Sequence, residues 1–259
     1  MPNVKVFNNF KVHTQYSICE GAIKIDDLAN HCKENKIPNI GICDSYNLCG
    51  ALEFAEKVSK IGTHPLIGTQ INFTLENTIA KLPLFASTSL GYKNLIKLSS
   101  ISYLDSDEKT DPHCKINVLK NNNDGLILLS GNHHGFFGKL FKLNKLKQIE
   151  ETVRELKNIF KDRFYLEIQR HNETGEENYE NFIIKLSEIS QIPLIATQEV
   201  FYLKKEMYEA HDALVCIGQK DFVDNPNRLK FSDQHFLKKN EDMVDLFKDI
   251  PEALENNYN

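Results

Sequence analysis

A chain of 259 residues with 41% hydrophobic content can bury the core of one large domain or two small ones. Its net charge of −5 excludes bulk electrostatic attraction as the main means of gripping nucleic acid, although a local basic patch is compatible with it. No stretch approaches the roughly 20 apolar residues of a membrane span, and the first ten residues lack the pattern of a secretory signal. We therefore expect a soluble, cytoplasmic protein whose six cysteines are free thiols.

Seven apolar runs recur along the chain, and their composition predicts strands. They cover residues 10–14, 37–44, 64–73, 82–87, 125–131, 163–170 and 192–200. Several are nearly continuous in Val, Ile and Leu, which is typical of strands that are buried on both faces in a parallel sheet.

Amphipathic patterns between these runs predict helices, most clearly over 24–35, 47–62, 143–160 and 177–191. Asn47 is a favourable N-cap for the second of these, which ends at a glycine.

Repeated alternation of strand and helix predicts a closed or nearly closed β/α barrel, with a doubly wound open sheet as the rival architecture. No G-x-G-x-x-G follows the first strand, which disfavours dinucleotide binding there. We expect the barrel to span 1–201 and the helical patterns of 202–259 to form an extension. The sequence stops inside a helical pattern, so we expect it to continue in a longer polypeptide.

Polar residues concentrate where the predicted strands end, which is the edge of a β/α barrel that carries chemistry. In chain order they are His13, Glu20, Asp44, Ser45, Gln70, Lys81, Asn132, His133, His134, Arg170, His171, Gln198 and Glu199, with Phe201 just beyond. Histidines and carboxylates that converge from several strands are the ligands of zinc and manganese sites. Polar strand ends are also what any barrel presents to water, so both interpretations stay open at this point.

The opening block, "FKVHTQYSICEGAIKIDDLANHCKENKIPNIGICDSYNLCGALEFAEKVSKIGTHPLIGTQINF", resembles a known family. Later blocks agree in the same order: "GYKNLIKLSS", "DGLILLSGNHHG", "RFYLEIQRH", "PLIATQEVFYL", "HDALVCIGQ", "NPNRLKFSDQHFL" and "DLFKDIPEALEN". The family is the polymerase and histidinol phosphatase (PHP) domain found at the start of bacterial DNA polymerase III alpha subunits. The resemblance covers nearly the whole chain.

The resemblance implies a distorted seven-stranded (β/α)7 TIM-like barrel. In active members, His and Asp/Glu residues at the carboxyl ends of the strands bind three metal ions, often zinc or manganese. Those sites hydrolyse phosphoesters, and in some replicative polymerases they provide a 3′–5′ exonuclease. Members that have lost the ligands are thought to support the polymerase and to dock the separate proofreading exonuclease subunit.

Four imidazoles of the family's ligand set are replaced in this chain. Lys11 takes the first place of the His-x-His motif, and Ser45 follows Asp44 where the family has Asp-His. Lys81 stands at the histidine before the fourth strand, and Phe201 ends the final Asp-x-His motif. An ammonium has no lone pair to donate and repels a divalent cation, so these changes weaken the implied site.

The remaining positions keep a ligand or part of one. His13 and His171 match the family's histidines, and Glu20 and Glu199 keep a carboxylate. Gln70 keeps an oxygen but loses the charge of the acidic ligand. The alternative to an inactive pocket is therefore a residual zinc or manganese site made of His13, Glu20, His171 and Glu199.

We expect no bound metal and hypothesise that Lys11 and Lys81 stand in for the lost cations. Their ammonium groups would offset the repulsion between Glu20 and Glu199 in a partly buried pocket. His133 or His134 could add to a residual site, but a glycine-rich turn with solvent-facing imidazoles is the favoured interpretation. The other histidines are interpreted as structural or surface residues without converging partners: His31, His64, His113, His211 and His235.

The leading functional hypothesis is a non-catalytic PHP module of a DNA-directed DNA polymerase, a nucleotidyltransferase that acts in DNA replication. Its expected partners are the rest of the polymerase alpha chain, the proofreading exonuclease subunit and, through the full polymerase, DNA. The second hypothesis is a divergent metal-dependent phosphoesterase or 3′–5′ exonuclease. The third, a stand-alone amidohydrolase-like barrel, is disfavoured by the polymerase-like blocks beyond the barrel.

Overall fold

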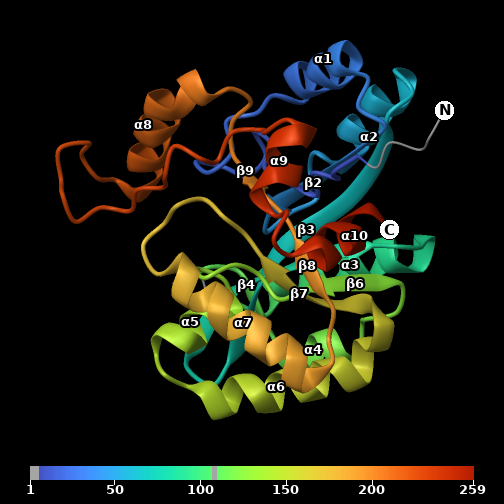
Figure 1. Cartoon of the computed structure of the whole chain (residues 1–259), viewed down its shortest axis with the longest axis vertical. Helices are drawn as coiled ribbons and strands as arrows, with labels where there is room; N and C mark the ends of the chain where they lie inside the picture. The colour runs from blue at the N-terminus through green and yellow to red at the C-terminus, as the bar shows by residue number, and fades with distance from the viewer. Residues whose placement is uncertain (1–5, 107–109) are drawn as a thin grey trace.

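The computed structural model describes residues 6–106 and 110–259, and among these residues seven strands form one curled sheet (Figure 1). The strand order is β2-β3-β4-β6-β7-β8, with β5 beside β3. The bounds are β2 (Asn39–Ser45), β3 (His64–Leu75), β4 (Thr78–Ala86), β5 (His113–Lys115), β6 (Leu126–Leu129), β7 (Phe164–Ile168) and β8 (Leu194–Ala196).

A separate parallel pair, β1 (Lys11–Val12) and β9 (Glu199–Val200), lies between the two ends of this sheet. β9 follows β8 after two residues, and on the other side the backbone N–H of Gly41 in β2 donates to the carbonyl of Asn9 at 2.9 Å. A Cβ on Gly41 would lie 2.5 Å from the carbonyl oxygen of Phe10, so only glycine allows this close approach. Together, the sheet and the pair form a nearly closed barrel.

β4 departs from the parallel arrangement that the apolar runs suggested, because it runs antiparallel to both β3 and β6. The turn between β3 and β4 has two residues, and Glu76 adopts a left-handed conformation with φ +52°. A connection of this length makes a hairpin, since a parallel crossover needs about a dozen residues or more.

Helices cover the outside of the barrel (Figure 1). They are α1 (Ile25–Asn35), α2 (Ala51–Lys60), α3 (Ser89–Leu104), α4 (Ile116–Lys120), α5 (Phe136–Lys142), α6 (Leu146–Phe160), α7 (Glu176–Ser190), α8 (Tyr208–Gln219), α9 (Asn240–Leu246) and α10 (Pro251–Tyr258), with 3-10 turns η1 (Lys161–Arg163) and η2 (Lys205–Met207). Within the described part of the chain, no helix is long and apolar enough to cross a bilayer.

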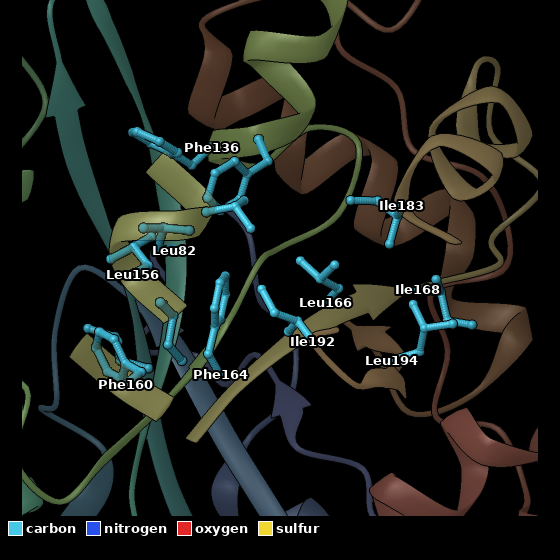
Figure 2. Close-up of a cluster of buried hydrophobic side chains, with 14 of the residues drawn as sticks. Leu82, Phe136, Leu156, Phe160, Phe164, Leu166, Ile168, Ile183, Ile192 and Leu194 are labelled. Atoms are coloured by element: carbon cyan, nitrogen blue, oxygen red, sulfur yellow. The ribbon is translucent and has the colours of Figure 1, made fainter. Parts of the chain in front are cut away.

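The alternation of side chains along β7 separates the core from the barrel interior. Phe164, Leu166 and Ile168 point outward into the large apolar core, where they meet side chains of α6 and α7 (Figure 2). Tyr165 and Glu167 lie on the opposite face, inside the barrel, because successive residues of a strand face opposite ways. A strand buried on both faces can therefore carry a carboxylate into the interior.

Helix α10 packs at the end of the barrel that lies opposite the charged side chains. The side chain of Asn257 in α10 accepts from the backbone N–H of Asn8 at 2.7 Å and donates to the carbonyls of Asn8 and Ala196, each at 3.0 Å. A cavity of about 390 Å³ lies beside these contacts, and Phe10, Phe85 and other apolar side chains line it. The two ends of the barrel therefore differ, since apolar side chains and asparagines line the cavity at this one, whereas lysine and carboxylate side chains line the cavity at the other.

All seven predicted strand regions contain strands, and the four predicted helices are present. The prediction that Asn47 caps α2 is wrong. The helix begins at Ala51, and Asn47 instead accepts from the N–H of Cys49 and donates to the carbonyls of Tyr16 and Ser45. Short β5 and helices α3 and α5 were not assigned from the sequence. The division at residue 201 stays a prediction.

Candidate functional site at the carboxyl end of the barrel

Residues of β3, β4 and β9 and of the segments that follow β2 and β6 help to line a cavity of about 690 Å³, which we call the mouth cavity. Its lining includes seven of the candidate residues named from the sequence: Glu20, Gln70, Lys81, Asn132, His134, Glu199 and Phe201. The remaining ones lie beside or beneath it, as follows.

Lys11 is buried beneath the mouth cavity, with 1% of its surface exposed. Its Nζ lies 3.0 Å from Oε1 of Glu167 and 3.5 Å from Oε2 of Glu199. Burial alone would lower the pKa of Lys11, but the two carboxylates outweigh burial and hold this pKa above its usual value. Lys11 is therefore a permanent buried cation between two strands, β7 and β9.

Glu199 is the most heavily bonded carboxylate of the site. Its Oε1 lies 2.9 Å from Nε2 of His13 and accepts from Gln70, and its Oε2 accepts from Asn132. Burial raises the pKa of Glu199, but Lys11 and His13 outweigh it, so the pKa lies well below the usual range. The parallel register of β1 with β9, in which Lys11 pairs with Glu199, sets up this contact.

Glu20 and Lys81 form a second ion pair at the rim, with Nζ and Oε1 2.5 Å apart. The hydroxyl of Ser45 donates to the other oxygen of Glu20 and accepts from Lys81 at 2.9 Å. The side chains of Lys81 and Glu20 are 23% and 30% exposed, so water screens this pair more than the Lys11 pairs. Burial lowers the pKa of Lys81, but Glu20 outweighs it and raises this pKa overall.

Asp44 braces the loop after β1. Its Oδ1 accepts from the backbone N–H of Thr14 at 2.6 Å and from the hydroxyl of Ser17 at 2.7 Å, and its Oδ2 accepts from the hydroxyl of Thr14 at 2.7 Å. Ser17 also lies 3.2 Å from Nδ1 of His13, so Asp44 indirectly orients this imidazole.

His171 is buried, and its Nε2 accepts a hydrogen bond from the backbone N–H of Glu199 at 3.3 Å. Burial, followed by the nearby charges of His235 and Lys238, holds the pKa of His171 well below its usual value. The ring of Phe201 packs against that of His13 at a tilt of 38°, with ring centroids 4.7 Å apart. His171 and Phe201 thus both contact the His13–Glu199 pair. The lone pair on Nε2 of the neutral His171 ring is already used as a hydrogen-bond acceptor for the backbone.

A group of imidazoles surrounds Glu173 on one side of the mouth; we call His133, His134, Glu173 and His235 the histidine cluster. Nε2 of His133 lies 3.2 Å and Nε2 of His134 2.9 Å from Oε2 of Glu173. Nε2 of His235 lies 2.9 Å from Oε1 of the same carboxylate. The His235 ring also stacks on His171, with centroids 4.0 Å apart.

Two interpretations of histidines are wrong. His133 does not face solvent, because it is 3% exposed, whereas its neighbour His134 is exposed as predicted. His235 has converging partners in Glu173 and the carbonyl of Glu199. His211 is a structural residue, since it is buried, contacts the carbonyl of Glu20 at 2.8 Å and stacks on Phe201.

The sequence interpretation missed two carboxylates of the site. Glu167 interrupts an apolar strand, "FYLEI", and its place opposite Phe164, Leu166 and Ile168 in the alternation was a usable signal for an inward-facing charge. Glu173 sits in the polar loop "NETGEE", which carries no such signal.

The fold and site define an α/β barrel protein whose charged side chains converge at the carboxyl edge of its sheet. The chain belongs to the PHP domain family, whose model matches residues 9–171.

Curated relatives extend the likeness over almost the whole chain. It is 37% identical over 254 residues to a DNA polymerase III subunit alpha from Rickettsia bellii, covering 98% of the chain and 22% of that protein. It is 36% identical over 258 residues to a DNA polymerase III subunit alpha from Caulobacter vibrioides, covering 96% of the chain and 23% of that protein. The chain thus spans less than a quarter of the length of these relatives.

Among solved structures, a two-domain protein from Bacteroides vulgatus containing a PHP-like metal-dependent phosphoesterase aligns at 11% identity with a TM-score of 0.48, covering 93% of this chain and 62% of that chain.

Proposed function

We propose that this chain is the PHP domain of a replicative DNA polymerase III alpha subunit in which lysine–glutamate ion pairs replace the metal ions. In this proposal it supports the polymerase and docks the proofreading exonuclease subunit, and it does not hydrolyse phosphoesters. It would act in DNA replication in the cytoplasm, joined to the rest of the alpha chain and meeting DNA through the full polymerase. The observation that carries the proposal is the buried ammonium of Lys11 between Glu167 and Glu199.

The donor set at the mouth does not fit the three-metal cluster that the family resemblance implies. Lys11 and Lys81 supply positive charge where ligands are expected, and each sits on a carboxylate that a metal would need. Phe201 and Ser45 supply no imidazole. Because the Nε2 lone pair of His171 accepts from a backbone N–H, the residual set of His13, Glu20, His171 and Glu199 has at most three donors ready to bind.

An exposed apolar patch beside the mouth supports the docking part of the proposal. Ile18, Ile217, Phe222 and Val223 are 81%, 71%, 80% and 55% exposed. The loop that carries Ile18 touches the end of α8, since a Cβ on Gly218 would lie 2.4 Å from Cys19. α8 and the loop after it stand out from the rest of the molecule (Figure 1). Apolar side chains gathered on a protruding segment are typical of a protein–protein contact.

Docking is tested with the purified exonuclease subunit encoded in the same genome, by isothermal titration calorimetry. Replacing Ile217 and Phe222 by serine should weaken binding at least tenfold, because apolar anchors dominate such interfaces. The matched control replaces Leu104 and Ile189, which are each 81% exposed on other helices. Equal affinity of both double variants for the subunit would exclude this patch, and no binding by the unmodified chain would refute the docking proposal.

The non-catalytic part is tested with a 3′-labelled single-stranded DNA and added manganese or zinc. We expect no release of mononucleotides by the unmodified chain. The alternative function, a residual phosphoesterase or 3′–5′ exonuclease, predicts release that is lost in His13→Ala and kept in His64→Ala, an exposed histidine at the other end of the barrel. That result would overturn the non-catalytic proposal.

A further inference from the structure

We propose that the histidine cluster is a zinc site, with His133, His134 and Glu173 as ligands and with His235 holding the second oxygen of the Glu173 carboxylate. None of these four residues is at a position that the family resemblance assigns to a metal. The inference does not depend on whether the mouth is catalytic, since it concerns a separate set of side chains.

The geometry of the cluster is close to that of a coordination sphere. Two ligand atoms about 2.0–2.1 Å from a tetrahedral zinc ion lie roughly 3.3–3.4 Å apart. The two imidazole Nε2 atoms lie 3.2 and 2.9 Å from Oε2 of Glu173, and all the ligand atoms lie within 4.8 Å of one another. Small side-chain rotations therefore suffice to place an ion between them. Two imidazoles and one carboxylate favour zinc over magnesium or calcium, which prefer oxygen ligands.

His133 provides a second, independent indication of a ligand. It is 3% exposed, and among the described residues neither of its ring nitrogens has a hydrogen-bond partner of acceptable geometry. Its Nε2 is near Glu173 but is not aligned to donate to it. A buried imidazole without a hydrogen bond is unfavourable, whereas coordination of a metal would satisfy its lone pair.

The groups around Glu173 keep its carboxylate ionised, as a metal ligand must be. Burial raises the pKa of Glu173, but the three imidazoles outweigh it and hold this pKa far below the usual range. His235 fixes the oxygen Oε1, which also accepts from the N–H of Ser232 at 3.4 Å. Carboxylates that bind metal ions in proteins are usually held in place by hydrogen bonds of this kind.

One cation competes with zinc. Nζ of Lys142, in α5, lies 3.2 Å from Nδ1 of His134, so His134 in this structure carries its proton on Nε2 and donates it to Glu173. Zinc binding at Nε2 would move that proton to Nδ1 or release it, and the exposed Lys142 would turn away.

An ion at this position would join the turn after β6 to the loop after β7, and the contact between His235 and Glu173 would link it to the segment that leads to α9. It would therefore stabilise the side of the mouth on which the extension folds back over the barrel. His134 also lines the mouth cavity, so solvent can reach the fourth coordination position.

The test measures zinc binding by the whole chain after removal of metal with a chelator. Competition titration should give one high-affinity zinc per chain at pH 7.5, and cobalt in its place should show the visible bands of a four-coordinate ion. His134→Ala and Glu173→Gln should each weaken zinc binding at least tenfold, and His64→Ala should not change it. Because the His134 side chain is 44% exposed, this variant should fold normally, and circular dichroism without metal verifies that.

Two outcomes would overturn the proposal. One is the absence of stoichiometric zinc on the unmodified chain. The other is zinc that persists in both His134→Ala and Glu173→Gln but is lost in His13→Gln, which would place the ion in the mouth and would instead contradict the proposed function.

Discussion

Two carboxylates on the same edge of the barrel, Glu199 and the partly exposed Glu173, are neutralised in different ways. Glu199 is bonded to Lys11, a group that stays charged across the physiological range, and to His13. Glu173 is surrounded by three imidazoles, a side-chain type that also binds metal ions. The first arrangement is a fixed structural element, whereas the second should respond to metal ions. The two regions can be separated by substitution, because Lys11 and Glu199 lie on strands β1 and β9, whereas Glu173 and its imidazoles lie in irregular segments.

The largest effect should come from Lys11→Met. It leaves Glu167 and Glu199 buried without a cation, and removing one partner of a buried ion pair costs about 3–5 kcal/mol. Urea denaturation at pH 7 measures the loss of unfolding free energy. The double variant Lys11→Met with Glu167→Gln should recover part of it, because one uncompensated charge is then removed. A loss below about 1 kcal/mol in Lys11→Met would mean that the ammonium does not neutralise the buried carboxylates.

The next effect is a loss of stability on mild acidification, and it should come from the histidine side of the mouth. His171 is held neutral by burial, so the unfolded chain binds a proton below about pH 6.5 that the folded chain does not. The free energy of unfolding should therefore decrease as the pH falls below that value, by up to about 2 kcal/mol at pH 5. His235, Lys238, Glu199, Glu173 and Glu176 are the charged or titratable groups that face this ring.

Urea midpoints between pH 5 and 8 measure this dependence. His171→Gln should flatten the curve, since its side-chain oxygen still accepts from the backbone of Glu199, and His64→Ala should leave the slope unchanged. The ion pairs of Lys11 should add little to this pH dependence. The pKa of Glu199 is depressed in the folded chain, so its protonation lowers the free energy of unfolding only below the pKa of about 4.5 that it has in the unfolded chain. An equal slope in His171→Gln and the unmodified chain would show that His171 is not the responsible group.

The comparison also shows which parts of the site a sequence can predict. The contact of Lys11 and Lys81 with the carboxylates of Glu199 and Glu20 was hypothesised because all four stand at positions that the family resemblance assigns to metal ligands, but which lysine meets which glutamate was not predicted. The strand regions followed from apolar runs, since each run contains a strand in the structure, although several strands are shorter than their run. The direction of β4 did not follow, since it depends on a two-residue turn that the strand predictions did not weigh.

The histidine cluster could not be predicted in the same way. Glu173 and His235 are 62 residues apart, and both lie in irregular segments where no periodic pattern reports which way a side chain points. The burial of His133 depends on how the turn after β6 is covered by its surroundings. For such contacts the fold must be known first, because loop positions are set by tertiary packing and not by local preference.

The smallest effect should come from Lys81→Met, which removes the cation at the rim. Its ion pair with Glu20 is partly exposed to water, so the expected loss is at most about 1 kcal/mol. High salt should reduce the difference between Lys81→Met and the unmodified chain, because screening weakens exposed pairs more than buried ones. The loss in Lys11→Met, in contrast, should hardly change with salt. Urea midpoints at low and high sodium chloride measure both. If Lys81→Met instead lost as much unfolding free energy as Lys11→Met, and the loss did not depend on salt, the rim pair would be as shielded from water as the buried pair. The distinction between a buried and an exposed lysine would then be wrong.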